Sequence, residues 1–237
     1  MIIKSINNMS EKSVINKVAL FLALLFHVCG LIGILFTSYK NWFIKSTPFT
    51  LLLMALLLVL THTPKNKKFF IFLFVTCAIG FSAEVVGANT GLLFGKYNYG
   101  DLLGIKFLNV PLVIAVNWFN IIYCAGMITQ SYEQFMIRKM EEQEMSISHR
   151  LQVTSFVVDA VLLVLLFDWI MEPVASKLGY WQWKNTDVPS YNYFTWAVIS
   201  IILFVVFRKL NKHSRNIFAI NLFIIQLLFC LALRTFL

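Results

Sequence analysis

Seven apolar runs follow one another along this chain of 237 residues, and most are long enough to cross a lipid bilayer as a helix. They lie near residues 18–37, 44–61, 69–89, 111–132, 153–174, 193–208 and 217–236. The hydrocarbon core of a bilayer is about 30 Å thick, so a spanning helix needs roughly 20 mostly apolar residues. Charged residues make up only 13% of the chain, too few for a soluble protein. We therefore predict an all-α integral membrane protein, with residues 1–237 forming a single bundle of about seven transmembrane helices.

The positive charges mark the ends of these runs and do not form one basic surface for nucleic acid, although the net charge is +9. If the runs alternate in direction, thirteen of the 20 lysines and arginines lie on the side of the N-terminal tail and seven on the other side. Cytoplasmic loops carry the excess of positive charge in membrane proteins. We therefore expect a cytoplasmic N-terminus, a bacterial cytoplasmic membrane as the location, membrane lipids as partners and no nucleic acid.

Four acidic residues lie inside the apolar runs; Asp159 is about 180° around its helix from Asp168 and belongs to a different contact, which leaves Glu84, Asp168 and Glu172. A charged side chain at membrane depth costs at least a few kcal/mol unless it faces a cavity or a partner, so such acids are typical of functional sites. Glu84 and Asp168 each come fifteen residues into a span that runs outward, about 22 Å along the helix at about 1.5 Å per residue. Glu172 follows Asp168 by one helical turn on the same face. We predict that all three are catalytic residues in one layer of the outer half of the membrane.

Aromatic and amide side chains gather near the expected level of these acids. Two glycine-bearing loops, after runs 69–89 and 153–174, carry tyrosines and tryptophans, and the run 111–132 brings an amide and an indole to the same depth. The predicted substrate-binding residues are Asn117, Trp118, Tyr97, Tyr99, Trp169, Trp181, Trp183 and Asn192. Aromatic faces stabilise a nearby cation, and a carboxyl group in such a site can act as a general acid. The combination suits protonation of a carbon–carbon double bond followed by capture of the carbocation by water.

Other interpretations of the intramembrane acids remain open from the residues alone. The acids can fix the helix bundle through hydrogen bonds, or they can form a proton or ion pathway as in transporters. A transporter is less favoured because the chain has no visible inverted repeat. We expect no cofactor and no metal, because the chain has no nucleotide-binding loop or haem motif and its four histidines are scattered singly.

Four short blocks stand in a fixed order between about residues 70 and 200. They consist of Glu84 with Gly87, Thr90-Gly91, Phe94-Gly95, Tyr97 and Tyr99; Val110-Pro111 with Trp118; Asp168 with Glu172-Pro173, Gly179, Trp181 and Trp183; and Pro189, Asn192 and Trp196. At these residues the sequence resembles the membrane carotenoid biosynthesis family, whose characterised members are the CruF-type carotenoid hydratases. Each block alone would be weak, whereas the order and spacing of the set are fairly specific.

The resemblance implies a carotenoid hydratase, a lyase that adds water to the terminal isoprenoid double bond of a linear or monocyclic carotenoid and needs no cofactor. A carotenoid substrate, and association with other carotenoid biosynthesis enzymes, would follow from it. The chemistry of the residues assigns Glu84 or Asp168 as the proton donor, with Glu172 and Asn117 tuning the pair by hydrogen bonding. The alternatives are a carotenoid cyclase or isomerase, which begins with the same protonation, and a non-enzymatic carotenoid- or lipid-binding or transport protein.

Overall fold

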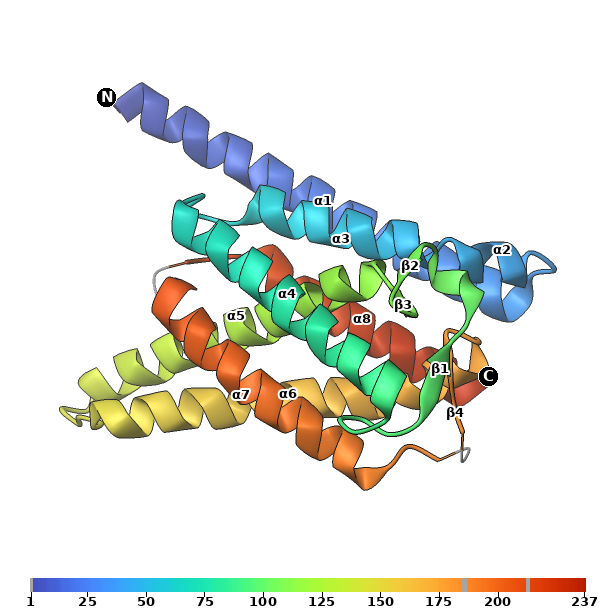
Figure 1. Ribbon diagram of the computed structural model, residues 1–237. Coiled ribbons are helices and arrows are strands. Elements are labelled where there is room, and N and C mark those ends of the chain that lie inside the picture. The colour runs from blue at the N-terminus through green and yellow to red at the C-terminus, as the bar shows by residue number, and fades with distance from the viewer. Residues whose placement is uncertain (1, 185–186, 212–213) are drawn as a thin grey trace.

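The computed structural model describes residues 2–184, 187–211 and 214–237, with side chains from residue 13 onward. This part of the chain is a bundle of eight α-helices (Figure 1). The helices are α1 (Ile2–Phe36), α2 (Lys40–Lys45), α3 (Thr47–Thr61), α4 (Lys67–Thr90), α5 (Val113–Glu141), α6 (His149–Lys177), α7 (Ser190–Asn211) and α8 (Ile217–Phe236). The predicted helical architecture is therefore confirmed.

Six of the described helices are long and apolar enough to cross a membrane: residues 13–36 of α1, and all of α4, α5, α6, α7 and α8. The second predicted span, 44–61, forms two helices, α2 and α3, which meet at Ser46. Helix α3 is apolar but has only 15 residues. The count of seven spans and the direction of the N-terminus therefore stay predictions.

Local side-chain chemistry explains where several helices begin and end. Asn66, Ser148 and Asn216 precede α4, α6 and α8, and each side-chain oxygen accepts a hydrogen bond from a backbone N–H in the first turn. These contacts satisfy amide groups that have no partner inside the helix. Helix α4 ends at Thr90 and is followed by Gly91, whose left-handed backbone (φ 72°) suits a residue without a Cβ atom.

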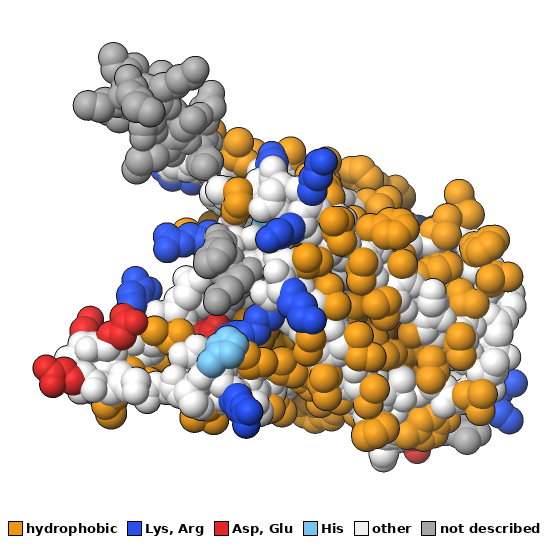
Figure 2. Space-filling model, turned by 60° about the vertical axis from the view of Figure 1, so that its left-hand side comes forward, with side chains coloured by type: hydrophobic (Ala, Val, Ile, Leu, Met, Phe, Trp, Pro, Cys, Tyr) orange, Lys and Arg blue, Asp and Glu red, His pale blue; other side chains and the backbone are white. Residues whose placement is uncertain are grey.

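Helix α5 lies at the centre of the bundle. Of the residues in its apolar stretch, 78% are buried, whereas the other five long helices bury 28–39%. The surrounding helices turn large apolar side chains outward, including Phe21, Phe74, Leu162 and Phe194. Figure 2 shows hydrophobic side chains over much of the surface, with lysines and arginines gathered toward the end where α5 and α6 join. This surface suits a protein surrounded by lipid.

Two short β-ribbons interrupt the helical pattern. Strand β1 (Tyr97–Tyr99) pairs antiparallel with β4 (Trp181–Trp183), and β2 (Lys106–Phe107) pairs with β3 (Val110–Pro111). A 3₁₀ turn, η1 (Asp101–Leu103), lies between β1 and β2. The β1–β4 pairing joins the two aromatic loops at one end of the bundle, which we call the ribbon end; the opposite end, where α5 and α6 meet, is the hairpin end (Figure 1).

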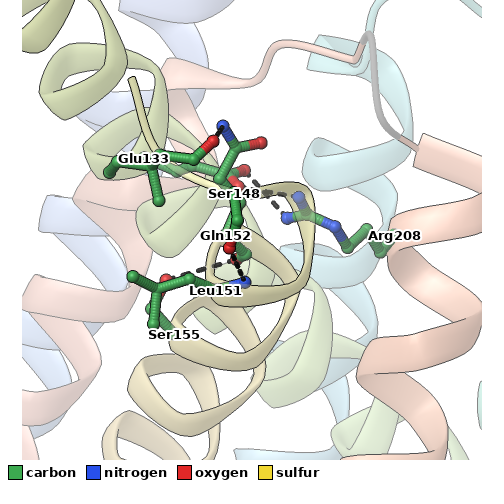
Figure 3. A network of polar contacts seen from close by, with 7 residues as sticks. Glu133, Ser148, Leu151, Gln152, Ser155 and Arg208 are labelled. Carbon is green, nitrogen blue, oxygen red and sulfur yellow. Dashed lines mark hydrogen bonds and ion pairs between the residues drawn. The ribbon is translucent and has the colours of Figure 1, made fainter. Parts of the chain in front are cut away.

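An ion pair ties the helices together near the hairpin end. Arg208 of α7 contacts Glu133 of α5 through two oxygens, with Nη2–Oε1 at 2.8 Å and Nη1–Oε2 at 2.9 Å (Figure 3). The same guanidinium lies 4.9 Å from the ring centre of Phe156 on α6. A partly buried, two-pronged pair of this kind is directional as well as strong. It fixes α5, α6 and α7 relative to one another, far from the ribbon.

Candidate active site

Glu84 lies on α4 below the ribbon and accepts three hydrogen bonds. Its Oε2 atom accepts from the hydroxyls of Tyr97 at 2.5 Å and Tyr99 at 2.7 Å. Its Oε1 atom accepts from Nε1 of Trp118 at 3.1 Å. All three partners donate, and an ionised carboxylate can accept from all of them at once. The side chain is only 6% exposed, so these contacts replace water around the carboxyl group.

Close packing between α4 and α5 lets Trp118 reach Glu84. A Cβ atom at Gly80, one turn before Glu84, would lie 2.3 Å from Cγ of Trp118, so only glycine leaves room for the indole. The Trp118 ring also stacks on Trp196 of α7, with centroids 3.9 Å apart and planes 9° apart. The two indoles therefore form a rigid aromatic wall beside the acid.

Glu172 of α6 is also held by the ribbon. Nε1 of Trp181 and Nε1 of Trp183 each donate to its Oε2 atom at 2.9 Å. Alternate residues of a strand point to one face, so Trp181 and Trp183 reach the same acid. The same alternation lets Tyr97 and Tyr99 reach Glu84.

The β1–β4 register brings these donor pairs together. Tyr97 lies opposite Trp183 and Tyr99 opposite Trp181, with ring centroids 5.0 Å and 5.9 Å apart. Burial, together with the charge of Glu84, raises the pKa of both tyrosine hydroxyls above their ordinary range. The hydroxyls therefore keep their protons at neutral pH and remain donors. One small ribbon thus orients two acids that come from different helices.

Asp168 lies one turn before Glu172 and is hydrogen-bonded to the side-chain amide of Asn192. Its Oδ2 atom accepts from Nδ2 of Asn192 at 3.0 Å, and its Oδ1 atom is buried without a partner among the described residues. Asn192 reaches the pocket described next, whereas Asp168 does not line it. Asp168 therefore contacts the pocket through Asn192.

A small pocket of about 30 Å³ lies between the acids and the aromatic rings. Its lining consists of Glu84, Phe94, Tyr97, Tyr99, Ile114, Asn117, Trp118, Met171, Glu172, Trp181, Trp183, Asn192 and Trp196. A water molecule needs roughly 10–15 Å³ measured in this way, so the pocket has room for one or two waters. Two carboxyl groups therefore face a space that is large enough for a water molecule.

A much larger, mostly apolar cavity of about 640 Å³ adjoins this pocket. The two share Ile114, Asn117, Met171 and Trp181 in their linings. Side chains from α1, α2, α3, α5, α6 and α8 enclose the cavity. Its lining includes Trp42 and Phe49, which are 64% and 60% exposed, so the cavity reaches the apolar surface beside α2 and α3. An apolar molecule dissolved in the membrane can approach the acids by this route.

The structure brings together nearly all of the site residues that the sequence predicted. Those lining the small pocket are Glu84, Glu172, Tyr97, Tyr99, Asn117, Trp118, Trp181, Trp183 and Asn192. Residues that the predicted site did not include are Phe94, Ile114, Met171 and Trp196. Trp196 carried a usable signal, because it follows Asn192 by four residues on the same face of a helix. Ile114 and Met171 look like any other apolar residue of a span and carried none.

Two predicted site residues do not line the pocket: Asp168 contacts it through Asn192, whereas the structure places Trp169 outside the site. Trp169 is 52% exposed and lines neither cavity, and the guanidinium carbon of Arg234 on α8 lies 4.1 Å from the centre of its ring. Pro173 explains the arrangement, because proline has no N–H to donate to the carbonyl four residues earlier. That carbonyl belongs to Trp169 and accepts instead from Nη1 of Arg234 at 2.8 Å. Trp169 therefore joins α6 to α8 on the outside of the bundle.

Comparison with known proteins gives one result. A family model described as "Carotenoid biosynthesis protein" matches residues 45–237, which include every residue of both the pocket and the ribbon. No curated protein and no solved structure matches the chain.

Proposed function

The chain belongs to the carotenoid biosynthesis protein family, as its motifs predicted, and from this premise we propose that it is a carotenoid hydratase. In this proposal it adds water to the terminal isoprenoid double bond of a linear or monocyclic carotenoid and forms a tertiary alcohol. The observation that carries the proposal is the pair of cavities: a water-sized pocket with two carboxyl groups lies next to an apolar cavity large enough for an isoprenoid end group.

The hydrogen bonds around the two acids support different roles. Glu84 accepts donors at both oxygens, which suits an anion, whereas Glu172 accepts at Oε2 and has no described partner at Oε1. A proton on Oε1 of Glu172 is therefore free to move. In the proposed first step Glu172 gives this proton to one alkene carbon, and the positive charge forms on the other, tertiary carbon.

Water completes the reaction. A water molecule in the small pocket bonds through its oxygen to the tertiary carbon, and Glu84 takes the proton that this oxygen loses. The net change is addition of one water to the double bond, with no redox step. Proton transfer from Glu84 to Glu172 through the next water in the same pocket restores both acids.

Aromatic faces and amides would stabilise and orient the intermediates. The stacked pair Trp118 and Trp196 lies in the pocket lining, and an indole face attracts a cation by about 0.5–2 kcal/mol, most where water is excluded. Asn117 faces both cavities and would contact the water or the new hydroxyl. Asp168 acts in this proposal as a positioning residue, because it reaches the pocket only through Asn192.

The proposal is tested by expressing the protein in a bacterium that accumulates a linear or monocyclic carotenoid and by analysing the extracted pigments by mass spectrometry. We expect a product heavier by the mass of one water. Glu172→Gln should abolish it, whereas Glu141→Gln, the same change at an exposed position on the hairpin, should not. A product of unchanged mass would identify a cyclase or isomerase, and unchanged pigment in both a linear and a monocyclic background would contradict enzymatic activity toward these substrates.

A further inference from the structure

Two of the polar side chains that line the large apolar cavity come from α1 and α8 and lie away from the acids. His27 on α1 and Gln226 on α8 both line it, and they are only 8% and 7% exposed. Neither residue lines the small pocket. A buried polar group without a hydrogen bond costs about 1–3 kcal/mol, so their hydrogen-bond partners matter.

The hydrogen bond of His27 determines which ring nitrogen can bind a ligand. Its Nδ1 atom lies 2.7 Å from the carbonyl oxygen of Ala23, one turn earlier on α1. A carbonyl only accepts, so Nδ1 carries the proton and Nε2 of the neutral ring is an acceptor. No described residue donates to Nε2. The ring is held in place by Phe229, which meets it edge-on with centroids 5.3 Å apart.

Gln226 lies at the same level on the neighbouring helix. Helices α1 and α8 run in the same direction (Figure 1), and a Cβ atom at Gly30 would lie 3.6 Å from the Phe229 ring. His27 and Gln226 each precede these contacting residues by three positions, so they share one depth. The Gln226 amide has no hydrogen-bond partner among the described residues. An acceptor on α1 and an unpartnered amide on α8 therefore meet the same part of the cavity.

We propose that the large cavity binds an isoprenoid that already carries a hydroxyl group, held by Nε2 of His27 and the amide of Gln226. The hydroxyl donates to His27 and accepts from Gln226, while the apolar walls hold the chain between it and the acid pocket. This inference rests on the proposed function only in taking an isoprenoid as the occupant. It implies that an oxygen-introducing reaction, a hydroxylation or an earlier hydration, precedes this protein's own step.

The test uses three probes with one carbon chain: geranylgeraniol, its methyl ether and the parent hydrocarbon. The alcohol can donate and accept, the ether can only accept, and the hydrocarbon can do neither. Protein in lipid nanodiscs loaded with equal amounts of the probes is examined by native mass spectrometry. We expect the wild type to retain the alcohol over the ether, and the ether over the hydrocarbon, each by about three- to tenfold, since one hydrogen bond is worth about that factor.

Variants separate the two contacts. His27→Phe should reduce retention of the alcohol to that of the ether, and Gln226→Leu should reduce retention of the ether to that of the hydrocarbon. Gln182→Leu, the same change at an exposed position of β4, should leave all three unchanged. Unchanged hydrocarbon retention shows that a variant is folded. If His27→Phe is not folded, His27→Gln, which keeps an acceptor, provides a second variant.

Equal retention of the three probes by the wild type would overturn the inference. So would a preference for the alcohol that survives in both His27→Phe and Gln226→Leu. The assay needs no turnover, so it is independent of whether the protein hydrates carotenoids, and a failure of the hydratase proposal would not change its result.

Discussion

Glu84 and Glu172 line the same pocket but have different hydrogen-bond partners. These partners are the reason why we propose Glu172 as the proton donor and Glu84 as the proton acceptor. Three donors surround both oxygens of Glu84, whereas two indoles share a single oxygen of Glu172. These contacts come from side chains that small neighbours allow to approach closely. The proposed reaction therefore depends also on single residues that position the hydrogen-bond donors of the two acids.

Gly80→Ala tests this dependence. The added methyl group would lie 2.3 Å from Cγ of Trp118 and must displace the indole from Glu84 and from Trp196. We expect conversion to fall by about ten- to a hundredfold, since a misplacement of about 1 Å can cost that much. Helix propensity alone would favour alanine by about 1 kcal/mol. Pigment analysis and thermal unfolding in detergent are measured together, with Ser82→Ala on the exposed face of α4 as the control. Full conversion by Gly80→Ala would contradict this packing argument.

His62 predicts a pH dependence of stability. It follows α3, stacks on Phe69 with centroids 3.7 Å apart, and its Nδ1 lies 2.5 Å from the hydroxyl of Tyr123. Burial lowers its pKa to about 4, below the ordinary value of about 6.5. Between these values the unfolded state binds more protons, so stability falls as pH drops from about 6.5 to about 4. The unfolding temperature should fall over this range, and less steeply in His62→Gln. The exposed control His149→Gln should follow the wild type; equal slopes in all three proteins would exclude His62 as the cause.

At the scale of elements, the β1–β4 ribbon couples two helices that lie far apart in sequence. Its tyrosines hold the acid of α4 and its tryptophans hold the acid of α6. Backbone hydrogen bonds from Gly100 to Tyr180 and from Lys184 to Lys96 extend the pairing at both ends. The position of the acids thus depends on α4, α6 and the ribbon together.

Arg234→Met tests the contact that joins α6 to α8. Arg234 binds the Trp169 carbonyl left without a helix donor by Pro173 and covers the Trp169 ring. Losing both contacts should lower the free energy of unfolding by about 1 kcal/mol. Denaturant unfolding in detergent measures the change. Arg234→Lys keeps the charge without the planar guanidinium group, so its free energy of unfolding should lie between those of the wild type and Arg234→Met. If Arg234→Met is as stable as the wild type, the carbonyl needs no partner from α8.

Hydropathy predicts the long helices well because each needs only its own apolar residues. The predicted run 217–236 coincides with α8, and 69–89 differs from α4 by two residues or fewer at each end. The break at Ser46 between α2 and α3 has no such signal. Nor have the strands, because three residues such as Tyr97–Tyr99 acquire β structure only through partners 82–86 positions away.

Depth along a helix predicted much of the site, whereas direction around the helix could not be predicted. Helix rise brings Glu84, Asn117 and Trp118 to one layer, and all three line the pocket. The same reasoning paired Glu84 with Asp168, but the acid of α6 that faces the pocket is Glu172, one turn nearer the ribbon. Which face of α6 points inward depends on packing against α5, α7 and α8, and that information is not local.

At the scale of the whole molecule, the two cavities and the apolar surface suggest how a membrane-dissolved substrate meets water. The large cavity reaches the surface beside α2 and α3, and the small pocket lies under the ribbon. The excess of lysine and arginine at the hairpin end leads us to propose that this end faces the cytoplasm. The ribbon end, with both aromatic loops, would then face outward.

Cysteine labelling tests this orientation. Lys184 at the ribbon end and Lys139 at the hairpin end are both exposed. With the four native cysteines replaced, Lys184→Cys should react with a membrane-impermeant maleimide in intact bacterial cells. Lys139→Cys should react only after permeabilisation. The opposite pattern would reverse the proposed orientation and place the ribbon on the cytoplasmic side.

The most direct test of the central proposal follows the atoms of water into the product. Purified protein is incubated with a linear carotenoid in heavy-oxygen water or in deuterium oxide, and the product is analysed by mass spectrometry. We predict one heavy oxygen in the new hydroxyl group, and one deuterium on the carbon that Glu172 protonates. Glu172→Gln and Glu84→Gln should form no labelled product. A hydroxylated product without the heavy oxygen, or wild-type conversion by both variants, would contradict hydration by this pair of acids.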